Sequence, residues 1–513
     1  MAMFPRIVPR AICRPIKDHG CSDAKCASGM ICHSTVQACA LLERAELYPW
    51  CNVGHVCTSA SEWRPLAFMD DNIKKYGPVF STMFMGQRAI VVADIDVLKR
   101  VLVKDFHKFV NRTAEQPGQN ESKSLLVNSV TAVRDERWKR ARNTITPAFT
   151  SGKMKHMTEL IDTCLAEFVD IIGKLAENGQ SFDAKELCGN FTMDAIAAIS
   201  FGMQIHAQSD PDNNQFMKHG KTLMNLRSEP GFWWKFLFAV LFRGTVTLIT
   251  RYTGYQLLFN EGETFFQTTI ERMIAERERH PKTSKPDFLQ LCMNEINDES
   301  GRQRMNKLDL MSNSMIFMVA GYDTTATTLA FVIFELTRNP DIQDRCLQDV
   351  VDNVDDVQHI TYDEANRLQY IEAVILETLR LYPAAPLSMR HSSQDFDCNG
   401  YVIPAETSFL IPIYQIQHNE SNYAEPEMFQ PERFYGVDNE GARNQFTFLA
   451  FGQGPRNCIG MRIAMMEMRM AIARLVHAFR FVPCQDTPSH PLELNSESLL
   501  KPKHPIVVKV ERR

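Results

Sequence analysis

The chain has 513 residues, of which 44% are hydrophobic, and it carries a formal net charge of −5. This length suffices for a large buried interior, and 32 phenylalanines suit an interior that accepts a hydrophobic cofactor. The negative charge and the lack of repeats, heptads or low-complexity tracts give no indication of nucleic-acid binding or of a repeat architecture.

The first 62 residues differ in composition from the rest of the chain. Half of the 14 cysteines fall there. These are Cys13, Cys21, Cys26, Cys32, Cys39, Cys51 and Cys57. Their spacing matches no zinc template, and no signal peptide indicates an oxidising compartment. We predict that residues 1–62 are an atypical, poorly structured extension, with a small disulfide or zinc module as the alternative.

Two segments bear on cellular location. Residues 1–17 carry four basic residues and no acid, which faintly resembles a mitochondrial transit peptide. Residues 231–242 are apolar except for Lys235 and contain Trp233 and Trp234. This run is too short to span a bilayer, so it is either a core helix or a contact with the membrane–water interface. We expect interfacial contact.

Amphipathic periodicity predicts most of the regular structure. Apolar residues recur at helical spacing over residues 155–178, 255–280, 308–338, 363–382 and 459–479. Asn399-Gly400 lies between two short β-prone runs and predicts a hairpin, and 407–413 predicts another strand. No Pro- or Gly/Ser-rich linker interrupts residues 63–513. We therefore expect one large domain there, mainly α with small β-sheets.

Three clusters of polar residues lie on predicted helices. Trp138 and Arg142 are four residues apart and share a helical face, as in any basic surface helix. Glu377 and Arg380 are three apart, which alone indicates an ordinary surface pair. Asp323 lies in the run 320–325, where it either caps a new helix or belongs to one long helix that continues from 308 to 338. The apolar periodicity on both sides favours the long helix.

The run 451–460, Phe-Gly-Gln-Gly-Pro-Arg-Asn-Cys-Ile-Gly, is the most informative segment of the chain. Two glycines and a proline make a tight loop that a flat cofactor can approach closely. Cys458 then precedes a helical pattern, where free N–H groups favour the thiolate. A small buried apolar cysteine is the alternative. A lone thiolate without a CxxC or a neighbouring histidine suits one axial bond to haem iron better than a zinc site or a disulfide.

Together these segments resemble the cytochromes P-450 over residues 63–510, and most resemble the branch that contains the drug-metabolising family-3 enzymes and thromboxane synthase. The runs 136–143 and 146–153 are especially similar to that branch. The resemblance implies the cytochrome P-450 fold, with a single large domain that binds haem b. It also implies a role for the matching residues of this chain.

By this resemblance, Cys458 is the axial ligand of the haem iron, and Asp323 and Thr324 relay protons to bound dioxygen. The other implied cofactor-binding residues are Phe451, Arg456, Trp138, Arg142 and Arg390. The implied structural brace of the cysteine loop consists of Glu377, Arg380 and Arg433, the last from the run Pro431-Glu-Arg-Phe434. The implied substrate cavity is apolar and contains Leu125, Leu126, Phe317, Val319, Ala320, Ala384, Ala385 and Leu387.

The implied activity is insertion of one oxygen atom from O2 into a hydrophobic small molecule, a xenobiotic or a lipid, with electrons from NADPH. The implied electron donor is NADPH–cytochrome P-450 reductase, with cytochrome b5 as a second candidate donor. Lys139, Arg140, Arg462 and Arg469 are candidates for a basic docking face. The expected location is the cytoplasmic face of the endoplasmic reticulum membrane, with mitochondria as the alternative.

Two other functions remain open at this point. One is a haem-thiolate isomerase or dehydratase that acts on a peroxide, and the other is a non-catalytic haem-binding protein. Neither needs a proton relay, so the presence of Asp323 and Thr324 favours the monooxygenase.

Overall fold

The computed structural model describes residues 65–84, 87–114, 122–224, 261–280, 287–296, 305–436, 444–496 and 499–513, with residues 234, 245, 248 and 252 in addition. Backbone contacts divide the chain into residues 1–53 and 54–513, and every described residue belongs to the second unit. The predicted extension 1–62 and nearly all of the run 231–242 lie outside the described residues. The predicted boundary at residue 63 stays a prediction.

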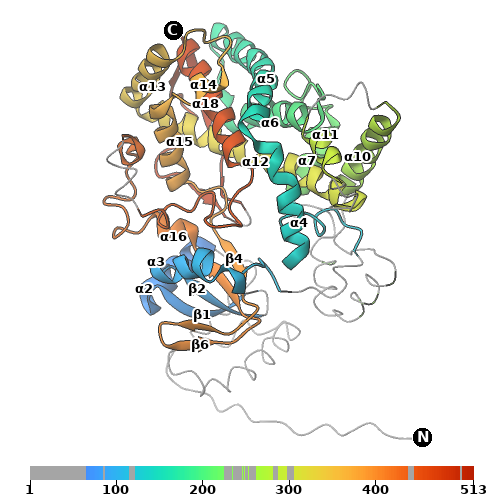
Figure 1. Cartoon of the computed structure of the whole chain (residues 1–513). Helices are drawn as coiled ribbons and strands as arrows, with labels where there is room; N and C mark the ends of the chain where they lie inside the picture. The colour runs from blue at the N-terminus through green and yellow to red at the C-terminus, as the bar shows by residue number, and fades with distance from the viewer. Residues whose placement is uncertain are drawn as a thin grey trace, which may run out of the picture. The chain divides into compact units, whose positions relative to one another are not determined.

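Helix α12 (Lys307–Arg338) runs through the centre of the helical part (Figure 1). It begins with a capping box, in which the side chains of Asn306 and Asp309 each accept a hydrogen bond from the other's backbone N–H. It is long and apolar enough to cross a membrane, but 78% of its apolar stretch is buried inside the protein. The helix continues through Asp323, which confirms one long helix rather than a new N-terminus there.

The neighbours of α12 bury most of its length. Helix α6 (Ala184–Phe201) packs most closely against it, and α7 (Gln215–Met224), α10 (Glu261–Arg279), α11 (Phe288–Asn294), α13 (Pro340–Asn353), α15 (Gln369–Leu381) and α18 (Met461–Ala478) also contact it. Helix α5 (Ser151–Glu177) packs against α6 and α18. A single large hydrophobic core of helix side chains results.

Four of the five predicted helices are confirmed to within a few residues over their described parts. The prediction for 363–382 is wrong as a single helix, because the structure has α14 (Tyr362–Ala365) and then α15. Thr361 and Glu364 form a capping box that begins α14, and Leu368 has ψ of 70°, a non-helical value, before α15 begins. The apolar periodicity continues across this break, so periodicity alone does not reveal it.

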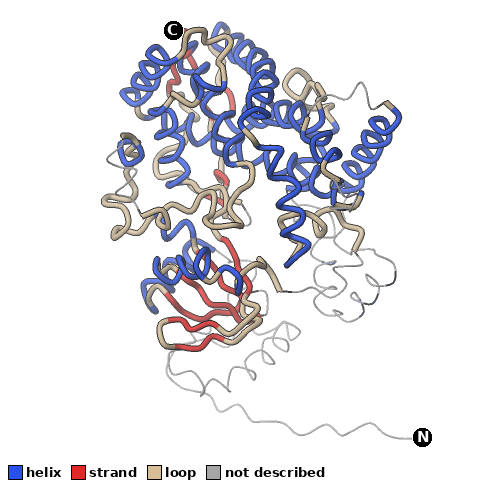
Figure 2. Tube along the Cα trace, viewed as in Figure 1, coloured by secondary structure: helices blue, strands red, loops and turns tan. Residues whose placement is uncertain are grey.

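The small sheets lie mainly beside one end of the helical layers (Figure 2). The largest has the order β1 (Val79–Phe84), β2 (Gln87–Val92), β7 (Ser408–Ile411), β4 (Ser388–His391), and only the β2–β7 pair is parallel. Helices α2 (Pro65–Tyr76), α3 (Ile95–Lys99) and α16 (Ile413–Gln417) belong to the same region. The predicted strand 407–413 is confirmed as β7.

The predicted hairpin is also confirmed. Strands β5 (Phe396–Cys398) and β6 (Tyr401–Ile403) pair in antiparallel fashion. Asn399 and Gly400 connect them with φ of 55° and 87°, and asparagine and glycine tolerate such values best. Elsewhere β3 (Phe182–Asp183), β11 (Val507–Arg512) and β8 (Phe479–Val482) form a three-stranded sheet, and β9 (Leu494–Asn495) pairs with β10 (Lys501–Pro502).

We predict that Gly321→Val destabilises the protein by about 1–3 kcal/mol, because a Cβ there would lie 2.7 Å from Ile196 Cδ1 where α6 and α12 cross. The double variant with Ile196→Ala should be more stable than the sum of the two single effects predicts. Denaturant unfolding measures this coupling. Gly152→Val is the matched control, since nothing lies within 4 Å of a Cβ at that helical position. Strict additivity of the two changes would contradict the prediction.

Candidate active site

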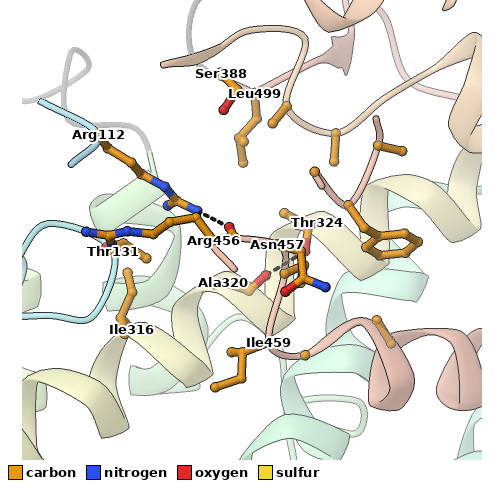
Figure 3. Close-up of a pocket in the computed structure, with 18 of the residues that line it drawn as sticks. Arg112, Thr131, Ile316, Ala320, Thr324, Ser388, Arg456, Asn457, Ile459 and Leu499 are labelled. Carbon is orange, nitrogen blue, oxygen red and sulfur yellow. Dashed lines mark hydrogen bonds between the residues drawn. The ribbon is translucent and has the colours of Figure 1, made fainter. Parts of the chain in front are cut away.

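One cavity of about 810 Å³ brings together most of the segments identified in the sequence. Its walls come from α12, α18, α4 (Asp135–Ile145), the segment 384–390 and the loop 449–460. In Figure 3, Thr324 and Ala320 of α12 face the same space as Asn457 and Ile459 of the loop, and Arg112 and Arg456 lie at one side of it. Residues far apart in the sequence therefore share one enclosed, largely apolar site.

The loop that carries Cys458 has a backbone that requires glycine. Gly452 and Gly454 have φ of 69° and 75°, and a Cβ on Gly454 would lie 2.0 Å from the carbonyl oxygen of Leu102. Leu102 belongs to a single π-helical turn, Arg100–Lys104. The N–H of Cys458 donates to the carbonyl of Phe451 at 2.8 Å and closes the loop. The small residues of the motif thus let two backbone segments touch.

The thiol of Cys458 is exposed, and the surface it exposes is that of the internal cavity. Burial among protein atoms raises its pKa. The N–H groups of Gly460 and Met461 and the positive charges of Arg142 and Arg112 act in the opposite direction. The bias toward thiolate expected from the helix N-terminus is therefore present, but burial outweighs it in the protein without a metal ion.

Four arginines surround the same part of the cavity. Arg456 is the most strongly fixed, since its guanidinium donates to the carbonyls of Val110, Val130 and Val133 at 2.9–3.0 Å. It also lies over the ring of Trp138, 4.2 Å from the centroid.

The other three arginines are held less completely. Arg142 donates to the backbone and side-chain oxygens of Asn457 at 3.0 and 2.8 Å. Arg112 donates to the carbonyl of Arg456, and Arg390 to that of Met389. The buried Nε atoms of both Arg112 and Arg390 have no hydrogen-bond partner. Among the described residues, these two Nε–H groups therefore have no acceptor and are available to a ligand.

These guanidinium groups repel one another in a buried region. Burial and then the neighbouring arginines lower the pKa of Arg456 to about 8, and burial and then Arg112 lower that of Arg390 to about 9. Buried cations of like sign are stable only beside anions that neutralise them. Haem is flat and carries two propionate carboxylates. The carboxylates fit the unused donors, and the iron fits the adjacent thiol. Sequence reasoning missed Arg112, because it belongs to no helical or strand pattern.

Thr324 and Asp323 are adjacent in sequence but face different surroundings. The Thr324 hydroxyl lines the cavity and donates to the carbonyl of Ala320 at 2.6 Å (Figure 3). Asp323 is only 2% exposed, does not line the cavity, and forms ion pairs with Lys185 of α6 at 2.9 Å and Lys501 of β10 at 2.7 Å. Burial alone would raise the pKa of Asp323, but the two lysines outweigh it and lower the pKa. The structure thus separates the expected relay pair.

The expected brace forms a compact ion-pair network. Arg380 and Glu377 are fully buried and share two hydrogen bonds of 2.7 and 2.8 Å, and Arg433 Nε lies 3.4 Å from Glu377. Gln417 extends this network, because its side chain donates to the backbone of Arg380 and accepts from the N–H of Leu449 at 2.8 Å. Leu449 leads directly into the cysteine loop. Gln417 carries no motif and was missed.

Most of the residues expected in the substrate cavity line it. Phe317, Ala320, Ala384, Ala385 and Leu387 do, whereas Leu125, Leu126 and Val319 are not among its lining residues. On α12 the lining positions are spaced by three and four, and Val319 lies off this face and is 2% exposed.

Neighbouring positions take the places of the residues that do not line the cavity. They are Ile316 on α12 and Val127, Val130 and Thr131 in the segment before α4.

The expected basic face is only partly available. Lys139 and Arg140 are exposed. Arg469 is 8% exposed and forms an ion pair of 2.5 Å with Glu372. Arg462 is exposed as well, although it also donates to Phe149, Ser151 and Tyr362. Internal contacts thus account for Arg469, whereas Arg462 remains at the surface.

Glu467 on α18 is a further feature that the sequence did not reveal. It lines the cavity, is 2% exposed, and its Oε1 has no hydrogen-bond partner. Burial raises its pKa to about 8. The group therefore holds its proton in the folded protein near neutral pH, but loses it in the unfolded chain.

We predict that wild-type protein loses stability as the pH rises from about 4.5 to 8, and that Glu467→Gln removes this loss. The pKa of Glu467 is raised by folding, so the neutral acid stabilises the fold at low pH and this contribution disappears as the pH passes the folded pKa. A tenfold change in a protonation equilibrium corresponds to about 1.4 kcal/mol. The difference in free energy of unfolding, variant minus wild type, should therefore be larger at pH 8.5 than at pH 5 by a few kcal/mol. Denaturant midpoints at both pH values measure this. Glu278→Gln, at an exposed position, is the control, and an unchanged pH dependence in Glu467→Gln would contradict the assignment.

Comparison with known proteins identifies the family of the chain. The cytochrome P450 family matches residues 45–510, beginning upstream of the boundary expected at residue 63. Cytochrome P450 3A12 of Canis lupus familiaris is 34% identical over 442 residues, and cytochrome P450 3A11 of Mus musculus is 34% identical over 445 residues. Each alignment covers 86% of this chain and 86% of the relative. The chain therefore belongs to the cytochrome P450 family, near its 3A members, and is a haem-dependent monooxygenase of that family.

Proposed function

We propose that this monooxygenase inserts one atom of O2 into a hydrophobic small molecule and takes its electrons from NADPH through a partner flavoprotein. The observation that carries the proposal is a single cavity with Cys458 on one wall and the Thr324 hydroxyl on another. The haem iron, when bound, supplies the oxygen-activating chemistry. The residues of the chain bind and orient it.

Cofactor binding is assigned to the thiol and the arginine cluster. Cys458 is the axial ligand, and the N–H groups of Gly460 and Met461 favour its thiolate. Phe451 closes the loop through its carbonyl. Arg142, Arg390 and Arg456 hold the propionates together with Trp138 and with Arg112, whose unused Nε makes it a further candidate.

Proton supply is assigned to α12. The Thr324 hydroxyl faces the cavity and can exchange its bond to Ala320 for one to a reacting group. We retain Asp323 as the acid of this relay. Because Lys185 and Lys501 hold both carboxylate oxygens, transfer through Asp323 requires that it leave at least one lysine.

The brace is assigned a structural role. The segment that precedes the cysteine loop is fixed by Glu377, Arg380 and Arg433. Gln417 connects this network to the loop, because its side chain accepts a hydrogen bond from the N–H of Leu449. None of these four side chains lines the cavity.

The wall composition supports an apolar and fairly large substrate. Ile316, Phe317, Ala384 and Leu387 are among the lining residues, and most of the lining surface is apolar. Leu125, Leu126 and Val319 are not proposed as substrate contacts.

Partners and location are proposed from the family resemblance. NADPH–cytochrome P450 reductase is the proposed donor, with cytochrome b5 as a second donor, and Lys139 and Arg140 are the proposed docking cations. The proposed location is the cytoplasmic face of the endoplasmic reticulum membrane. Trp234, which is described within the run 231–242, is 76% exposed, and this exposure supports contact with the membrane interface.

The same loop and arginine cluster would also serve a peroxide isomerase, so turnover is the measurement that tests the oxygen-insertion reaction. The presence of Asp323 and Thr324 favours the monooxygenase. Consumption of NADPH and O2 in the presence of the reductase would separate the two, whereas turnover of a hydroperoxide without NADPH would support the isomerase.

We predict that Cys458→Ala abolishes the thiolate-type ferrous–CO absorption band, because no other cysteine is among the described residues that line the cavity. The spectrum of the purified full chain with haem measures this. Cys484→Ala is the matched control, since that half-buried thiol lies outside the cavity, and it should keep the band. A normal thiolate band in Cys458→Ala would refute the ligand assignment.

We predict that Thr324→Ala keeps the ferrous–CO band but lowers the product formed per NADPH by about tenfold or more, because the hydroxyl assigned to proton supply is removed. Product and NADPH are measured together with a reductase and a hydrophobic probe substrate. Thr337→Ala is the control, because Thr337 makes the same i−4 hydrogen bond, to Ile333 at 2.7 Å, away from the cavity. Equal coupling in wild type and Thr324→Ala would remove Thr324 from the mechanism.

A further inference from the structure

One wall of the cavity is built from irregular backbone. The segment 122–133 has turns but no helix or strand, and its residues Val127, Val130, Thr131 and Ala132 line the cavity. Irregular backbone keeps a fixed position only when other groups satisfy its N–H and C=O groups. The groups that do so therefore determine the shape of this wall.

The second half of the segment is held from α12 and from the cysteine loop. The side chain of Asn313 accepts from the N–H of Val130 at 2.8 Å. Arg456 donates to the carbonyls of Val130 and Val133 at 3.0 and 2.9 Å. Asn128 fixes the turn itself, since it donates to the carbonyls of Ser122 and Ser124 at 2.8 and 2.7 Å.

The first half is held by a different element. Glu263 lies in the first turn of α10 and is 2% exposed. Its Oε1 accepts from the N–H groups of both Leu125 and Leu126, and the Ser124 side chain also hydrogen-bonds to the carboxylate. Three consecutive residues of the wall thus donate to one buried carboxylate.

The positions of these bonds matter for the cavity. Leu125 is completely buried and Leu126 packs against the main core, and Val127, the next residue, lines the cavity. A bond from N–H to a carboxylate is stronger than one to a neutral acceptor. Breaking these bonds would leave a buried carboxylate and two backbone donors without their partners, so the first turn of α10 and this part of the wall are held together.

We propose that Glu263 is a positioning residue for substrate: it couples the first turn of α10 to the first half of the wall segment, residues 124–126, and so sets where Val127 lies in the cavity wall. The inference rests on the proposed function only in taking this cavity as the substrate site. Residues that touch the substrate are displaced when Glu263 is lost, although Glu263 itself does not line the cavity.

The test compares ligands that share one binding atom but differ in bulk. Imidazole and 4-phenylimidazole both bind haem iron through nitrogen, and their dissociation constants are read from the shift of the haem spectrum. In the full-length holoenzyme, Glu263→Ala should leave imidazole binding within about twofold and change 4-phenylimidazole binding by about fivefold or more, as expected for loss of a charge-assisted hydrogen bond. Glu263→Gln keeps one acceptor oxygen without the charge and should lie between Glu263→Ala and wild type.

The matched control is Glu276→Gln, an exposed acid on the same helix, which should alter neither ligand. A general loss of stability would weaken both ligands alike, so the ratio of the two constants separates positioning from a merely structural effect. An unchanged ratio in both Glu263 variants would overturn the proposal.

Hydrogen exchange gives a second readout that depends on neither ligand binding nor turnover. The amides of Leu125 and Leu126 should be protected in the wild type and should exchange about tenfold faster or more in Glu263→Gln. If these amides exchange in the wild type as fast as those of an open loop, the proposal is overturned. This measurement does not require Glu263→Ala to fold. Failure of the proposed function would instead appear as an absent thiolate band with this protection intact.

Discussion

The concentration of buried positive charge around one cavity is the constraint on which the rest of the site depends. Burial lowers the pKa of Arg112, Arg142, Arg390 and Arg456, neighbouring arginines lower it further in all but Arg142, and two of the four keep unused donors. In a region of low dielectric constant such a cluster is unfavourable without anions. A dianionic cofactor resolves this constraint, so the arginines and the cofactor site form one electrostatic unit.

The same cluster also connects parts of the structure that are distant in sequence. Arg456 belongs to the cysteine loop, yet it holds the wall segment through the carbonyls of Val130 and Val133. Gln417 joins the loop to the buried pair of Glu377 and Arg380 on its other side. The loop is therefore held on one side through Arg456 and on the other through Gln417. Neither side chain takes part in a bond-making or bond-breaking step.

Sequence patterns predicted those features that depend on neighbours along the chain. The long helix through Asp323, the Asn399-Gly400 hairpin and the glycine-rich loop before Cys458 follow from local periodicity and local backbone preference. Arg112, Gln417, Glu263 and Glu467 could not be found in this way, because their importance arises from contacts with residues that are remote in sequence. The orientation of Asp323 is intermediate: the lining positions on α12 fall in the adjacent pairs 316/317, 320/321 and 324/325, and residue 323 lies just outside the last pair.

The contact between Gly454 and Leu102 has a consequence for variation in this protein. The cysteine loop lies against a single π-helical turn whose residues carry no recognisable motif. The backbone path of that turn therefore determines where the sulfur atom of Cys458 lies. Substitutions or insertions within Arg100–Lys104 can displace the metal ligand while every residue that identifies the enzyme remains intact, so a sequence can keep all of its signatures and still lose activity.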